Sequence, residues 1–89
     1  MVQIKNKKTI DGDTFKGDDG KYYRLANVNT PEKGKKGYVK ATKELDKLLS
    51  DNTLVVKTVG KSYGRDVVEL RKSGEKTTIN NKMKRKGYK

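Results

Sequence analysis

Cysteine, histidine and tryptophan are absent from this chain of 89 residues, and proline occurs only once. Without cysteine or histidine the chain has no thiol nucleophile, disulfide framework, zinc or haem site, or Ser-His-Asp triad. Any catalysis must therefore come from carboxylates, Lys, Arg, Tyr or hydroxyl groups, or from a metal ion held by oxygen ligands.

Large apolar residues are also scarce. Leu, Ile, Val and Phe make up 18 of the 89 residues, which is close to the composition of intrinsically disordered chains. No apolar run approaches the length of a membrane-spanning helix, and residues 1–5 lack the apolar segment of a signal peptide. We therefore expect a cytoplasmic protein. With no conspicuous apolar patch in the sequence, we expect a monomer.

Positive charge is the main surplus. The chain has 23 Lys and Arg residues against 11 Asp and Glu residues, which gives a net charge of +12. This balance favours a polyanionic partner, with nucleic acid first and an acidic membrane surface second. We expect the partner to be DNA or RNA, preferably single-stranded, and not a membrane.

The spacing of apolar residues and turn residues along the sequence indicates whether so polar a chain folds. Short blocks rich in valine and aromatic residues, separated by Gly-rich and Asp-rich turns, predict β-strands at residues 2–4, 21–28, 53–59 and 66–71. Apolar residues at helical spacing predict helices at residues 37–50 and 80–86. The predicted class is mainly β with α (α+β). The predicted order β-β-β-α-β-β-α is typical of a single domain built on a small five-stranded barrel, with helices packed at one end.

Three patches hold most of the candidate chemistry: residues 10–14, residues 24–32 and residues 63–65. Taken alone, the Asp-Gly-Asp of the first patch is an ordinary turn, and Gly64-Arg65 is a hairpin turn with a solvated arginine. Together they put acids, an asparagine and two arginines at strand ends, which a small barrel could bring to one rim.

In their order along the chain these patches resemble the staphylococcal nuclease (thermonuclease) family. The similarity covers Ile10-Asp11-Gly12-Asp13-Thr14-Phe15, Tyr23-Arg24-Leu25, Val28-Asn29-Thr30-Pro31-Glu32, the first helix, Tyr63-Gly64-Arg65, and Ile79-Asn80 leading to Gly87-Tyr88. The resemblance implies an OB-fold barrel covering residues 1–89. It also implies calcium-dependent hydrolysis of DNA and RNA, with little sequence preference and with 3′-phosphate products.

The resemblance also implies a role for each matching residue. Asp13, Asn29 and the Thr30 carbonyl would bind Ca²⁺, with Asp11 nearby. Arg24 and Arg65 would hold the phosphate, and Glu32 would activate or position the attacking water. The nucleic-acid contacts that we expect are Lys33, Lys35, Lys36, Lys61, Tyr63 and Tyr88.

These assignments agree with the chemistry of phosphodiester hydrolysis. The reaction adds negative charge to the phosphate oxygens, which a hard cation and two guanidinium groups can stabilise. Arginine suits this role because its planar fork can contact two phosphate oxygens at once. In the absence of histidine, a glutamate is the natural group to accept the proton of the attacking water.

Two departures from the family pattern weaken the prediction. Asn29 stands where the family usually has a metal-ligating aspartate, and an amide oxygen brings no charge to a calcium site. The chain also ends after the second helix, where family members continue with further tyrosines. We expect either a nuclease with weakened calcium binding or, as the alternative, an OB-fold module that binds nucleic acid without cutting it. A basic adaptor that docks on proteins or membranes is a third reading.

Overall fold

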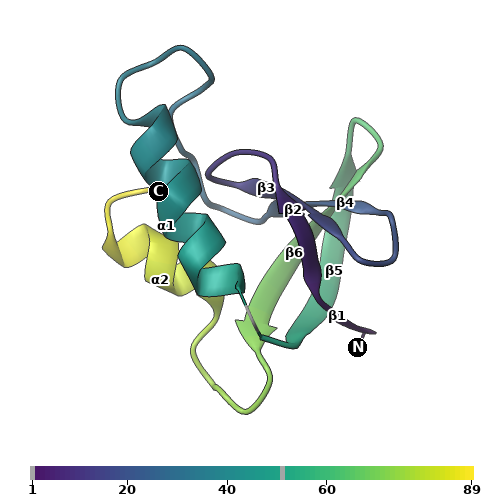
Figure 1. Cartoon of the computed structure of the whole chain (residues 1–89). Helices are drawn as coiled ribbons and strands as arrows, with labels where there is room; N and C mark the ends of the chain where they lie inside the picture. Colours follow the sequence, from purple (N-terminus) through teal and green to yellow (C-terminus); the bar gives the residue numbers. More distant parts are fainter. Residues whose placement is uncertain (1, 51) are drawn as a thin grey trace.

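The computed structural model describes residues 2–50 and 52–89 (Figure 1). Its elements follow one another as six strands and two helices, with both helices in the second half of the order. The bounds are β1 (Val2–Ile4), β2 (Asn6–Thr9), β3 (Thr14–Gly17), β4 (Tyr22–Leu25), α1 (Tyr38–Leu49), β5 (Leu54–Ser62), β6 (Arg65–Lys72) and α2 (Ile79–Arg85).

The strands form one sheet in the order β1-β5-β6-β4-β3-β2, in which β4 and β6 run parallel and all other neighbours are antiparallel. Strands β1 and β2 lie at opposite edges of this sheet, yet only Lys5 separates them in the chain. The sheet therefore curls until its two edges meet at Lys5.

The two helices pack together at one end of the curled sheet (Figure 1), where Lys86 after α2 forms an ion pair with Glu44 of α1 at 3.9 Å. Helix α2 begins at Thr78, whose side chain accepts a hydrogen bond from the Asn81 N–H, as a capping threonine does. The largest fully buried side chains come from strands and helices alike: Phe15, Leu25, Leu45, Leu49, Leu54, Leu70, Ile79 and Met83.

The predicted α+β class and both helices are confirmed. The strand count differs from the prediction, because the structure has six strand segments and not five, and both β2 and β3 lie outside the predicted strand ranges. Segment β2 (Asn6–Thr9) is rich in lysine and largely exposed, so its sequence carries no apolar strand signal. The predicted strand 21–28 ends early, because the chain turns at Ala26 and Asn27 has a φ of 59°. Within the described residues, neither helix is long and apolar enough to cross a membrane.

Candidate active site

Hydrogen bonds within the turn, to the sheet and to the first helix fix the turn between β2 and β3. The N–H groups of Ile10 and Asp11 both donate to the Thr14 carbonyl, at 3.0 and 3.1 Å. The Asp13 carbonyl accepts from the Leu25 N–H of β4 at 2.8 Å, and the Tyr38 hydroxyl of α1 donates to the Ile10 carbonyl at 3.0 Å. This turn is therefore held against both the sheet and the first helix.

Gly12 lets this turn approach its neighbours closely. A Cβ atom at this position would lie 2.8 Å from the Cβ atoms of Ala41 and Thr30, which is closer than side chains pack. Because Gly12 has no side chain, the turn can rest on α1 and on the segment that carries Asn29 and Thr30. The glycine thereby brings the first two sequence patches together.

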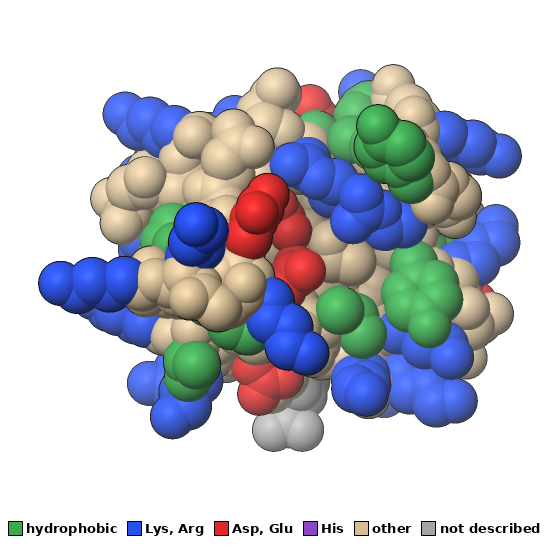
Figure 2. Space-filling model, turned by 90° about the horizontal axis from the view of Figure 1, so that it is seen from above, with side chains coloured by type: hydrophobic (Ala, Val, Ile, Leu, Met, Phe, Trp, Pro, Cys, Tyr) green, Lys and Arg blue, Asp and Glu red, His purple; other side chains and the backbone are tan. Residues whose placement is uncertain are grey.

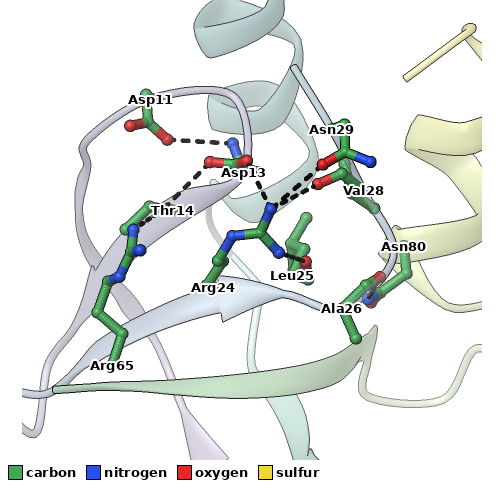
Figure 3. A network of polar contacts seen from close by, with 10 residues as sticks. All are labelled: Asp11, Asp13, Thr14, Arg24, Leu25, Ala26, Val28, Asn29, Arg65 and Asn80. Carbon is green, nitrogen blue, oxygen red and sulfur yellow. Dashed lines mark hydrogen bonds and ion pairs between the residues drawn. The ribbon is translucent and has the colours of Figure 1, made fainter. Parts of the chain in front are cut away.

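Asp13 has a mostly buried carboxylate in this turn, with 17% of its side chain exposed. Its oxygens accept a hydrogen bond from the Thr14 hydroxyl at 3.1 Å and lie 3.5 Å from Nη2 of Arg24 (Figure 3). Burial and the neighbouring Asp11 carboxylate raise the pKa of Asp13 from 3.8 to about 6, against the opposing effects of Arg24 and Thr14. Such a shift in a group near two arginines is typical of functional sites.

Arg24 connects Asp13 to the segment after β4. Its Nη1 donates to the Leu25 carbonyl at 3.1 Å, and its Nη2 donates at 3.4 Å to both the Val28 carbonyl and Asn29 Oδ1. The contacts of Nη2 are long for N–H···O bonds, so this edge of the guanidinium is loosely held. Asp13 and Asn29 therefore both face the same nitrogen of Arg24.

Arg65 reaches the same place from β6. Its Nη1 donates to the Thr14 hydroxyl at 3.3 Å, although β4 lies between β6 and β3 in the sheet. The side chain must therefore cross the outer face of β4, on the side where Arg24 also projects (Figure 3). The two arginines and Asp13 form one cluster, as the sequence predicts.

Most of the remaining predicted residues are exposed on two segments outside this cluster. Glu32, Lys33, Lys35 and Lys36 are exposed on the loop before α1, while Lys61 and Tyr63 are exposed at the β5–β6 turn. The loop and the turn project at the same end of the molecule, on opposite sides of the β2–β3 turn (Figure 1). Seen from that end, acidic side chains gather near the centre of the face and Lys and Arg side chains border them (Figure 2).

Tyr88 is not part of this cluster. It packs against the hydrophobic core near the two helices, and burial together with the nearby Glu44 raises its pKa. Its position is that of a side chain closing the end of the core.

Asn80 supports the site, although its sequence match alone predicted no role for it. It is 3% exposed, and its side-chain amide donates to the carbonyls of Ala26 and Val68 at 2.9 and 3.0 Å. Its Oδ1 accepts from the Leu70 N–H at 2.8 Å. Asn80 thus ties α2 to β6 and to the start of the segment that carries Asn29 and Thr30 (Figure 3). The sequence did contain one indication of this role, because Asn80 is a polar residue on the apolar side of the second predicted helix.

Comparison with known proteins adds no assignment. The chain matches none of the protein families scanned, and no curated protein is significantly similar to it.

The donor set of the cluster suits a hard cation in kind. Asp13 and Asn29 supply a carboxylate and an amide oxygen that both lie against Nη2 of Arg24, and calcium prefers oxygen ligands of these types. In the described part of the chain, no group of three or more His, Cys, Asp or Glu side chains converges. The negative charge at the site therefore comes from Asp13 and the adjacent Asp11.

Proposed function

We propose that this protein is a calcium-dependent phosphodiesterase that cleaves DNA and RNA with little sequence preference, and that it is similar to the staphylococcal nuclease family. The observation that carries the proposal is the convergence of Arg24, Arg65 and Asp13 from three strand ends onto one patch of the surface. Two guanidinium groups beside a carboxylate form a preorganised site for a phosphate and a cation.

The proposed fold is an OB-type barrel. If β1 and β2 are counted as one strand bent at Lys5, the six segments make five strands that close on themselves. The parallel pairing of β4 with β6 supplies the closing contact. This reading supports the function because such barrels bind oligonucleotides across an outer face.

In the proposed reaction, Arg24 and Arg65 hold the nonbridging oxygens of the scissile phosphate. The loosely held Nη2 edge of Arg24 can turn from its protein acceptors to the phosphate at little cost. Glu32 accepts a proton as water attacks phosphorus, the bond from phosphorus to O5′ breaks, and O5′ takes a proton from solvent water, which leaves a 3′-phosphate and a 5′-hydroxyl. Asp13, Asn29 and the Thr30 carbonyl would hold Ca²⁺, which supplies additional stabilisation of charge on the phosphate when bound.

A second candidate function is binding of nucleic acid without cleavage. Glu32 favours it, because this side chain is exposed on a lysine-rich loop, whereas the arginines lie in the cluster. Asn29 also favours it, because the amide adds no charge to the metal site.

The decisive experiment incubates single-stranded DNA and RNA with the protein at about millimolar calcium, a range typical of weak calcium sites. We expect cleavage that EGTA abolishes and that Arg65→Ala lowers by about 10²–10³-fold, the usual cost of losing a group that stabilises the transition state. Arg85→Ala is the matched control, because it removes an equal charge from an exposed position on α2. Asn29→Asp should raise activity at low calcium.

The outcomes separate the two candidates. Calcium-dependent products that disappear in Arg65→Ala and persist in Arg85→Ala support the nuclease. Binding that depends on Arg65 without any cleavage at high calcium supports the binding module. If both variants behave like the unmodified protein, neither function belongs to this cluster.

A further inference from the structure

Tyr22 is a large aromatic side chain that the proposed chemistry does not use. It is 45% exposed on β4, and Nζ of Lys16 lies 5.4 Å from the centroid of its ring. Its neighbour Tyr23 points the other way and is buried against Phe15 in the core, with ring centroids 5.4 Å apart. Tyr22 therefore lies on the outer face of the sheet.

Strand register places Tyr22 beside the two arginines. Lys16 pairs with Tyr22, and Thr14 pairs with Arg24, so these four side chains share the outer face of β3 and β4. On the other side of β4, Tyr23 pairs with Asp66, which sets Arg65 next to Tyr22 across the parallel β4–β6 pair. Tyr22 and Arg24 are two residues apart on one face, about 6.6 Å along the strand.

The direction of the Arg65 side chain links Tyr22 to the arginine pair. Its side chain starts level with Tyr22 and ends at the Thr14 hydroxyl, which is level with Arg24. The Arg65 side chain therefore crosses the outer face of β4, from the level of Tyr22 to the level of Arg24. A phosphate held by both arginines would lie next to the exposed ring.

We propose that Tyr22 and Lys16 form a nucleotide subsite adjoining the arginine pair, in which the ring stacks on a base of single-stranded nucleic acid and Lys16 contacts the next phosphate. This inference rests on the proposed function, because it assumes that Arg24 and Arg65 hold a phosphate. A base stacks on an aromatic ring whatever its identity, so the subsite adds affinity without adding sequence preference.

Charge supports a polynucleotide as the occupant. Tyr22 has Lys16 beside it on one strand and Arg65 beside it on another, and both are cationic. Tyr63 is exposed on the adjoining β5–β6 turn and directly follows Ser62, which pairs with Arg65. The ring of Tyr22 thus lies between cations on the two neighbouring strands, and an aromatic ring beside positive charge is a pattern with which proteins bind single-stranded nucleic acid.

The test measures binding of fluorescent oligothymidylate by anisotropy, in EDTA so that no cleavage occurs. Tyr22→Ala should weaken binding by about five- to a hundred-fold, the range reported for losing one stacked base, while Tyr22→Phe should bind like the unmodified protein. For an oligonucleotide of abasic sites, Tyr22→Ala and the unmodified protein should bind alike. Lys16→Met should lower the slope of log affinity against log salt by about 0.7, the value for one phosphate contact on a single strand.

Val39→Ala is the control for loss of an exposed apolar side chain, because Val39 is 61% exposed on α1, outside the site. Equal affinities of Tyr22→Ala and Val39→Ala for oligothymidylate would overturn the subsite, provided that Arg65→Ala still weakens binding. An equal loss for abasic and thymidine strands would overturn the stacking role. If Arg65→Ala also leaves binding unchanged, the proposed function itself fails, and the subsite fails with it.

Discussion

Asn80→Ala is predicted to destabilise the protein severely. The substitution removes three hydrogen bonds from a side chain that is 3% exposed. The Val68 carbonyl keeps a partner, because the Ala26 N–H also donates to it at 2.8 Å. The Leu70 N–H and the Ala26 carbonyl lose theirs, and each buried polar group left without a partner costs about 1–3 kcal/mol.

The expected loss is therefore about 2–6 kcal/mol. A domain of this length has a total stability of about 4–13 kcal/mol, so the variant keeps little reserve. In urea, with an m value of about 2 kcal/mol/M, the unfolding midpoint should fall by about 1–3 M. Circular dichroism during a urea titration measures it directly.

Asn81→Ala is the matched control, because Asn81 is the exposed neighbour on the same helix and its main-chain N–H makes the capping bond to Thr78. It should unfold within about 0.5 kcal/mol of the unmodified protein, as exposed substitutions do. Asn80→Asp keeps the acceptor for Leu70 but sets a carboxylate against two carbonyl oxygens, so its loss should grow with pH. A midpoint for Asn80→Ala close to that of Asn81→Ala would refute the reasoning.

Two further predictions concern the β2–β3 turn. Because the pKa of Asp13 is raised from 3.8 to about 6, folding favours its protonated form, and the free energy of unfolding should fall as pH rises from about 4 to about 6. Asp13→Asn should remove this fall and raise the free energy of unfolding by up to about 3 kcal/mol at pH 7. Urea unfolding of both proteins at pH 4 and pH 7 measures the difference. If the variant and the unmodified protein depend on pH alike, the assignment to Asp13 is wrong. Gly12→Ala should cost about 1–3 kcal/mol, because its Cβ would meet Thr30 and Ala41 at 2.8 Å. Gly60→Ala, with open space around it, should cost less in the same assay, and equal losses would show that the close approach is unimportant.

Local patterns predicted the helices well, because each has apolar residues at regular spacing. Leu45 and Leu49 are buried on one face of α1, and Ile79 and Met83 are buried on α2. The edge segment β2 was not predicted, because its side chains are mostly exposed and its pairing with β3 is decided by the closure of the sheet. Such long-range pairing leaves little trace in the sequence of an edge strand.

The members of the candidate cluster were predicted residue by residue, from the resemblance of the sequence patches to a known family. That Arg24 and Arg65 would meet followed from strand ends sharing a rim, and the structure brings both to the Asp13–Thr14 turn. The way in which the cluster is held could not be predicted. It depends on Gly12 packing against α1 and on Asn80 bonding across three segments, and neither contact has a local sequence pattern.

Asp13 and Asn80 are both largely buried polar residues, but they affect the stability of the fold in opposite ways. Asn80 has partners for its amide and its carbonyl, so it stabilises the fold without carrying charge. Asp13 is buried beside another carboxylate, and its raised pKa means that its ionised form lowers stability at neutral pH. An asparagine at position 13 would avoid this penalty. The proposed binding of a cation at Asp13 would offset this penalty, because a cation favours the ionised carboxylate.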